Sequence, residues 1–454
     1  MKSRPKRRDL LTAAGVGLAG LAGCSDLIGG GNNRDIPGDA ENQSEGWEVK
    51  LGVLAPQSGS LETFGDEFTN VVELVERQLA ASAGGFTLDT AVRDTESDPD
   101  TAASAAQELV DEGYQALVGP GSGEVAATVA EEVLVPESVP AVSPLAATGI
   151  TELDDEDFLF STTVRASAIS QSLSRPIATA RTNSASIVHT LNGYGTTIAD
   201  SVSEGLELRG IDVPAQVGIE DFEASSYTSV LEEAMADDPE SLVVAADPVT
   251  GTQLLKDFYA EHESQPMFLT DRLRLPDLPS QVDSDMADVR AISQRPRWDY
   301  SERQAPETTV EGTADATAVG EDADLLQPFH KAYQTAFEEF PTVQAAQTFD
   351  ATVVLALASI GAGEDNYSGD VIQDRIRKLS NEQTGYEGVR LFGQHNYWEG
   401  TSVIADGVRN NYIGAAGDVE FDTGTGQQRT PYLQAAKFAP ETDSGFEETL
   451  SIPT

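Results

Sequence analysis

Short apolar strands alternate with amphipathic helices along most of the chain, and this alternation is the pattern that most limits its fold. The first set of strands is expected at 49–55, 86–92, 116–119 and 141–143, and the helices between them at 64–79, 99–110 and 125–134. A second set follows, with strands at 185–189, 215–219, 241–245 and 267–269 and helices at 196–208, 227–235 and 251–259. Strands and helices that alternate form parallel sheets covered by helices on both faces. The sequence therefore predicts an α/β fold with two doubly wound parallel-sheet lobes.

The length of the chain also favours two lobes, because one hydrophobic core rarely serves more than about 250–300 residues. Three further helices are expected at 325–340, 345–360 and 371–379. The stretch at 300–322 is polar and is expected to be a surface excursion.

The N-terminal residues have the pattern of an export signal. Five basic residues precede an uncharged, mildly apolar run at 10–23. This run is shorter than the roughly 20 residues that a membrane-spanning helix needs. Arg7 and Arg8, followed by Asp9-Leu10-Leu11, resemble a twin-arginine signal. Residues 1–23 are therefore expected to be a twin-arginine signal peptide.

Cys24 is the only cysteine in 454 residues and directly follows Leu21-Ala22-Gly23. This arrangement resembles a lipobox, in which the peptide is cut before the cysteine and the thiol is lipidated. The alternative is a buried, unmodified cysteine behind an ordinary cleaved signal. We expect lipidation, because small residues and a cysteine directly after the apolar run are a specific arrangement. Residues 24–47, rich in Gly, Asn, Asp and Glu, then form a lipidated flexible tether to the membrane.

The charge of the chain excludes one class of partner. The sequence has 76 acidic and 28 basic residues, for a net charge of −48. Such a field repels phosphate backbones, so nucleic-acid binding is not expected. The acidic residues are spread over the whole chain, as on the solvated surface of a halophile's protein. An exported lipoprotein with this charge resembles haloarchaeal surface proteins.

Several motifs, in order, resemble the type I periplasmic-binding-protein family, specifically the leucine/isoleucine/valine-binding-like receptors of ABC importers. They are Lys50-Leu51-Gly52-Val53-Leu54-Ala55-Pro56 with Ser58-Gly59, Leu117-Val118-Gly119-Pro120 with Ser122, Ser143-Pro144, Asn192-Gly193-Tyr194-Gly195, Leu269-Thr270-Asp271 and Gly414-Ala415-Ala416-Gly417-Asp418. The resemblance covers the chain from Val49 to about Phe438.

The resemblance implies both a domain arrangement and a function. Lobe one is expected at 48–165 plus 293–413 and lobe two at 166–292 plus 414–441, joined by three hinge crossovers, with a C-terminal tail at 442–454. The implied function is capture of a small solute, a branched-chain or other amino acid or a related amide, by hinge closure. The solute is delivered to the permease subunits of an ABC transporter. The receptor is implied to be a monomer without a cofactor, lipid-anchored on the extracellular face of the cell membrane.

The family places its ligand between the lobes, and the resemblance carries four candidate positions over to lobe one. Ser122 is a candidate for the ligand carboxylate, and its alternative role is the N-cap of the following helix. The next equivalent loop supplies Ser143, Ala146 through its backbone, and Thr148. The chain is about one residue shorter here than the family pattern.

Lobe two supplies three further candidates. Tyr194 matches a ligand-facing tyrosine, and Asp271 matches an acidic residue for the ligand ammonium, with a helix cap as its alternative role. Asp247 stands where relatives often have an aromatic residue, and Arg272 where they commonly have glycine. Arg272 is expected either to clamp a second carboxylate or to pair with Asp271. These departures leave a more polar ligand open.

Two other classes of function were weighed against the receptor. An enzyme is not expected, because the four histidines are far apart and no HExxH, GxSxG or CxxC motif occurs. A metal is not expected either, because the acidic cluster at 94–100 lacks the spacing of an EF-hand loop. The alternative that remains is a ligand-sensing module that acts through a separate signalling partner.

Overall fold

The computed structural model describes most of the chain after residue 46. The described residues are 47–81, 85–146, 148, 153, 155–220, 222, 224–262, 265–296, 328–379, 390–393, 397, 410–417, 419–422, 425–426, 428, 433–442 and 444–452. The expected signal with Arg7 and Arg8, the lipidation site Cys24, the tether up to residue 46 and the surface excursion at 300–322 lie outside the described residues.

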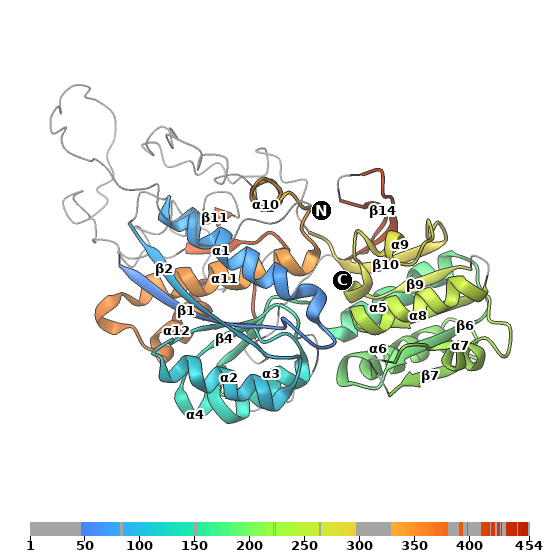
Figure 1. Cartoon of the computed structure of the whole chain (residues 1–454), viewed down its shortest axis with the longest axis horizontal. Coiled ribbons are helices and arrows are strands. Elements are labelled where there is room, and N and C mark those ends of the chain that lie inside the picture. The colour runs from blue at the N-terminus through green and yellow to red at the C-terminus, as the bar shows by residue number, and fades with distance from the viewer. Residues whose placement is uncertain are drawn as a thin grey trace, which may run out of the picture. The chain divides into compact units, whose positions relative to one another are not determined.

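The first sheet has five parallel strands in the order β2-β1-β3-β4-β5. They are β1 (Glu48–Ala55), β2 (Thr87–Asp94), β3 (Leu117–Val118), β4 (Ala141–Ser143) and β5 (Leu159–Ser161). The connecting helices include α1 (Gly65–Ala80), α2 (Pro99–Asp111), α3 (Gly123–Val129) and α4 (Val135–Glu137). Three helices from far along the chain join this lobe: α10 (Phe329–Phe337), α11 (Val343–Ala362) and α12 (Gly369–Leu379). Because α11 packs on α1 and on β1, β3 and β4, it completes the core of lobe one (Figure 1).

The second sheet has seven strands in the order β14-β13-β10-β9-β8-β6-β7. They are β6 (Ala185–Thr190), β7 (Gln216–Ile219), β8 (Ser241–Ala245), β9 (Met267–Leu269), β10 (Val289–Gln294), β13 (Leu433–Phe438) and β14 (Phe446–Ile452). The helices of this lobe are α5 (Ala166–Thr179), α6 (Gly193–Glu207), α7 (Thr228–Ala234), α8 (Pro248–Glu261) and α9 (Leu278–Gln281). The strands from β10 to β7 are parallel, whereas β13 and β14 are antiparallel to their neighbours.

The expected α/β fold with two parallel-sheet lobes is therefore confirmed, with a difference at the C-terminal end. Residues 446–452, within the segment expected to be a tail, form the edge strand β14 and pair with β13. Four further elements, β5, α5, β10 and β13, were not predicted from the sequence. These short strands lack a distinct alternation, and the many serines of α5 weaken its helical pattern.

The central strands β6, β8 and β9 of lobe two are buried on both faces, which explains their largely apolar sequences. Successive residues of β8 point to opposite faces of the sheet. Val243 packs in the hydrophobic cluster that contains α5 and α6, whereas Val244 packs in the cluster with α7 and α8. The sheet is thereby fixed between two layers of helices, and its loops hold constant positions at the sheet edge.

Helix α11 is buried along its whole length, although one face carries polar side chains. One described helix, α11, has the length and apolar composition of a membrane span, but 94% of the relevant window is buried inside the protein. Here it is a core helix.

The polar face of α11 binds all three segments that connect the lobes. Gln347 Nε2 donates to Thr163 Oγ1 at 3.0 Å, after β5, and to Gln294 Oε1 at 2.9 Å, at the end of β10. The carboxylate of Asp350 accepts from the backbone N–H groups of Ala415 and Ala416, before β13, at 2.7 and 2.8 Å. The three crossovers therefore share one buried helix as their support.

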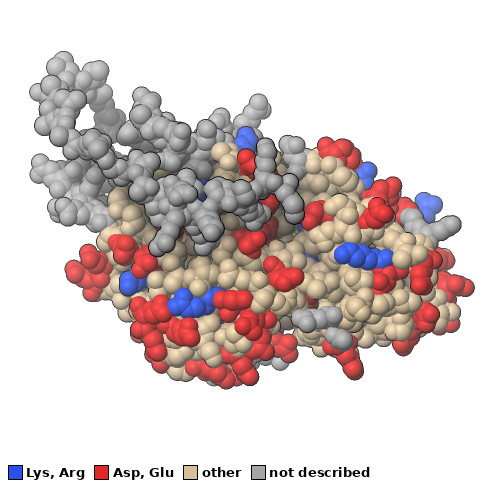
Figure 2. All heavy atoms as spheres, viewed as in Figure 1, with Lys and Arg blue, Asp and Glu red and all other residues tan. Residues whose placement is uncertain are grey.

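Acidic side chains are scattered over the visible face of the described residues, with few basic ones among them (Figure 2). Several of the basic residues form exposed ion pairs, such as Lys378 with Asp374. On this face of the described residues, acidic side chains therefore occur over both lobes (Figure 2).

Candidate functional site

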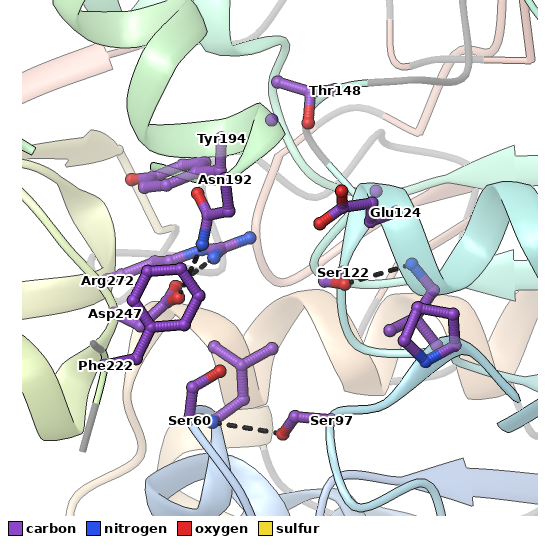
Figure 3. A pocket seen from close by; sticks show the side chains of 15 residues that line it. Ser60, Ser97, Ser122, Glu124, Thr148, Asn192, Tyr194, Phe222, Asp247 and Arg272 are labelled. Atoms are coloured by element: carbon purple, nitrogen blue, oxygen red, sulfur yellow. Dashed lines mark hydrogen bonds and ion pairs between the residues drawn. The ribbon is translucent and has the colours of Figure 1, made fainter. Parts of the chain in front are cut away.

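A cavity of about 90 Å³ lies between loops of the two lobes (Figure 3). Its lobe-one lining consists of Ser60, Leu61, Ser97, Pro99, Ser122, Gly123, Glu124, Val125 and Thr148. Its lobe-two lining consists of Asn192, Gly193, Tyr194, Phe222, Asp247 and Arg272. Most of these loops follow the carboxyl ends of parallel strands, where doubly wound sheets bind their ligands. The volume would hold roughly six to nine water-sized groups.

The lobe-one wall is built on the first turn of α3. Ser122 Oγ accepts from the backbone N–H of Val125 at 3.3 Å, so Ser122 caps α3 and lines the cavity as well. A Cβ atom on Gly123 would lie 2.1 Å from the carbonyl oxygen of Thr148. Glycine at 123 therefore allows Thr148 to approach α3. The hydroxyl groups of Ser122 and Thr148 both line the cavity.

The loop after β1, which also lines the cavity, is held by hydrogen bonds to the end of β2 and the loop after it. Asp94 accepts hydrogen bonds from the backbone of Gln57 and from both the backbone and the hydroxyl of Ser58, at 2.8–3.2 Å. Ser97 Oγ accepts from the N–H of Leu61 and donates to the carbonyl of Ser58. Part of the acidic cluster at 94–100 thus fixes the loop that lines the cavity.

In lobe two, Asn192 connects two helix starts. Its Oδ1 accepts from the N–H of Gly195 at 2.9 Å and caps α6, while its Nδ2 donates to Asp247 Oδ2 at 2.9 Å. Asp247 precedes α8, which begins at Pro248 as helices often do. A Cβ on Gly195 would lie 2.2 Å from the carbonyl of Thr190, so this tight turn requires glycine.

Arg272 and Asp247 form an ion pair at the cavity wall, with each side chain only 2% exposed. The guanidinium carbon of Arg272 lies 3.7 Å from the centroid of the Tyr194 ring. Arg272 also donates to the carbonyl of Leu145 in lobe one at 3.4 Å. Burial opposes the charge of Arg272, but the carboxylates of Asp247 and Asp271 and the Tyr194 hydroxyl raise its pKa. The guanidinium therefore stays charged and links both lobes.

Asp271 lies behind this pair. Its Oδ1 accepts from the Tyr194 hydroxyl at 2.6 Å, and its backbone carbonyl accepts from Gln344 of α11 at 3.1 Å. Burial raises the pKa of the Asp271 carboxyl, while the bond from Tyr194 and the charge of Arg272 lower it in part. Burial and the nearby Asp271 raise the pKa of Tyr194 well above its usual value. Tyr194 therefore acts as a neutral hydrogen-bond donor.

The structure brings four of the seven candidate residues to the cavity: Ser122, Thr148, Tyr194 and Asp247. Ser143, Ala146 and Asp271 are described but do not line it. Ser143 donates to the carbonyl of Pro120 at 2.6 Å and accepts from the N–H of Ala146 at 3.0 Å. The carbonyl of Ala146 accepts from Ser161. Both backbone groups of Ala146 are thus already engaged within the protein.

Most of the other lining residues were not found from the sequence. Arg272 was considered as a partner of Asp271, but its ion-pair partner is Asp247. Arg272 and Asp271 both contact Tyr194, Arg272 at the ring and Asp271 at the hydroxyl. Asn192 stood in a quoted motif and has the residue type of an N-cap, which could have identified it. Phe222 gave no signal, because it lies in a polar loop outside any periodic segment.

Phe222 also borders a second, more open cavity of about 540 Å³, lined by residues of both lobes such as Glu62 and Lys256. The two cavities therefore share Phe222 in their walls. No group of three or more His, Cys, Asp or Glu side chains in the described part of the chain could hold a metal ion.

The family model for periplasmic binding proteins matches residues 48–404, which is most of the chain. The chain belongs to the periplasmic binding protein family. Because this is a family of binding proteins, the expectation that the chain is not an enzyme is confirmed. No curated protein matches the sequence.

Solved structures of this family share the fold of the chain. The branched-chain amino acid transporter substrate binding protein LivJ from Streptococcus pneumoniae, in complex with isoleucine, has a TM-score of 0.65 and 19% identity, over 90% of this chain and 99% of that one. A solute binding protein from R. palustris, in complex with benzoate, has a TM-score of 0.69 and 15% identity, and the match covers 90% of this chain and 98% of that one. A substrate-binding protein from Desulfitobacterium hafniense, complexed with Leu, has a TM-score of 0.62 and 17% identity, and the match covers 89% of this chain and 100% of that one. At these identities the likeness concerns the fold.

Proposed function

We propose that this protein is an extracellular receptor that captures a small solute by hinge closure and delivers it to an ABC importer. The observation that carries the proposal is the cavity between the lobes, to which both lobes contribute polar side chains. A ligand that contacts both walls gains contacts that exist only when the lobes are close together, so it favours the closed state.

The lining suggests how a zwitterionic ligand would bind. The hydroxyl groups of Ser122 and Thr148 can donate to a carboxylate, and Asp247 can accept from an ammonium group. Tyr194 contributes the edge of its ring. In this proposal Ser143 and Ala146 support the loop of Thr148, and Asp271 orients Tyr194 rather than binding the ligand directly.

An amino acid or a related amide is the solute class that we propose. Two of the structurally similar proteins were solved with isoleucine and leucine, and a third with benzoate. Each of these ligands carries a carboxylate, which matches the hydroxyl groups on the lobe-one wall.

The proposal places the receptor on the extracellular face of the cell membrane as a monomer, anchored by a lipid on Cys24 after twin-arginine export. Its partners would be the permease subunits of an ABC transporter. The alternative is a sensing module with a separate signalling partner, and the same cavity would serve it.

The proposal can be tested by measuring ligand-induced closure. Thermal-shift screening of amino acids, amides, urea and benzoate in molar KCl would identify the ligand. Small-angle X-ray scattering should then show a smaller radius of gyration with ligand than without. If no solute raises the melting temperature and the radius stays constant, solute capture is wrong. Deletion of the genes for the partner permease would separate import from sensing, because only import depends on the permease.

A further inference from the structure

We infer that Arg272 determines which solutes the cleft accepts, and that the ligand is a small polar amino acid without a branched aliphatic or aromatic side chain. This inference rests on the proposed function, because it takes the cavity to be the solute site. It assigns to Arg272 a specificity role beyond its ion pair with Asp247.

Arg272 removes the main apolar wall that the cavity could offer. Its guanidinium covers the ring of Tyr194 at 3.7 Å, and the Tyr194 hydroxyl is bound to Asp271. An aromatic face that carries a cation can no longer pack against a leucine side chain.

The remaining apolar side chains offer little surface in its place. Four of the fifteen lining residues, Leu61, Pro99, Val125 and Phe222, have apolar side chains, whereas nine carry polar side chains. A branched or aromatic ligand would therefore lose contact with water without gaining a matching apolar wall.

The charges of the lining favour a zwitterion over a simple acid. Asp247 neutralises Arg272, and Glu124 adds a further negative charge on the opposite wall. A lone carboxylate such as benzoate would meet no uncompensated cation. A zwitterion can place its ammonium group near Asp247 or Glu124. Its carboxylate can accept from the hydroxyls and from Arg272, whose guanidinium has five N–H groups.

The test compares the wild type with a variant that lacks the ion pair. The double substitution Asp247→Asn with Arg272→Gly removes the guanidinium from the Tyr194 ring together with the charge of its ion-pair partner, while Asp271 keeps the hydrogen bond from the Tyr194 hydroxyl. Arg181→Gly is the matched control, because Arg181 is exposed and has a φ of +59° that glycine readily adopts. Calorimetric titration in molar KCl uses glycine, serine, asparagine, leucine and benzoate with each protein.

We expect the wild type and Arg181→Gly to bind a polar amino acid at least about tenfold more tightly than leucine or benzoate, and the double variant to reverse this order. Wild-type preference for leucine or benzoate would overturn the inference but leave the receptor proposal intact. Failure to bind any polar amino acid would overturn it as well. If the double variant does not fold, Asp247→Asn with Arg272→Met keeps the volume of the side chain, and an unchanged preference in it would count against Arg272.

Discussion

Replacement of Asp350 by alanine should destabilise the protein through the segment that enters β13. The side chain is fully buried in α11, and its carboxylate accepts from the Tyr412 hydroxyl at 2.9 Å and from the N–H groups of Ala415 and Ala416 at 2.7 and 2.8 Å. Each buried donor left without an acceptor costs about 1–3 kcal/mol. Water that enters the vacated space can accept from some of these donors. We therefore expect the free energy of unfolding to fall by about 4 kcal/mol, near the low end of the sum for three donors.

Urea unfolding in molar KCl measures this loss as a shift of the transition midpoint. Asp350→Asn keeps one acceptor oxygen and should lose about half as much. Asp374→Ala is the control, because the Asp374 side chain is exposed on α12 and its pair with Lys378 should contribute less than about 0.5 kcal/mol. A loss below about 1 kcal/mol for Asp350→Ala would refute the reasoning, since it would mean that the crossover keeps its position without this carboxylate.

Four further predictions concern pH, salt, the anchor and the site. Burial raises the pKa of the Glu67 carboxyl to about 7, so the folded state binds this proton more firmly than the unfolded state. The free energy of unfolding should therefore fall as the pH rises from about 4.5 to 7. Urea titrations at several pH values should show that Glu67→Gln removes this part of the pH dependence. The melting temperature should rise from 0.1 M to molar KCl, because the Debye length shrinks to about 3 Å at 1 M and screens the charge of −48; a flat curve would contradict the halophile interpretation. Cys24→Ala should release the protein from membranes or leave its precursor uncleaved, as cell fractionation would show, and a cleaved, membrane-bound variant would exclude lipidation. Asp271→Ala should weaken the binding of an amino-acid ligand about tenfold in calorimetric titration, because Tyr194 loses its acceptor. Equal affinities would show that ligand binding does not depend on the orientation of Tyr194 by Asp271.

The repeated strand–helix pattern was enough to predict the fold class, because strands buried on both faces and amphipathic helices leave strong local patterns. The helix α11 was expected at 345–360 and extends over 343–362. The edge strand β14 was missed, because its pairing with β13 depends on a tight return of the chain near Gly445, which has a φ of +73°.

The candidate site was predictable only in part, and the reason is the distance along the chain between partners. Tyr194 and Asp271 are 77 positions apart, and Arg272 and Asp247 are 25 apart. Residue types alone left two roles open for Arg272, a clamp for a second carboxylate or a pair with the adjacent Asp271. The geometry of the loop after β9 instead directs the guanidinium toward Asp247 and the Tyr194 ring. Which of two nearby carboxylates an arginine meets depends on backbone geometry that local patterns do not encode.

The way in which α11 completes lobe one has a consequence for the order of folding during synthesis. The five strands of the first sheet are complete at Ser161, but α11 covers β1, β3 and β4 only after residue 343 has been made. Lobe two likewise receives β13 and β14 after residue 432. A nascent chain that ends between these points exposes apolar strand faces, which makes it prone to aggregate. Contacts this distant in sequence also slow folding. Both lobes therefore complete their cores late in synthesis, lobe one with α11 and lobe two only with β13 and β14.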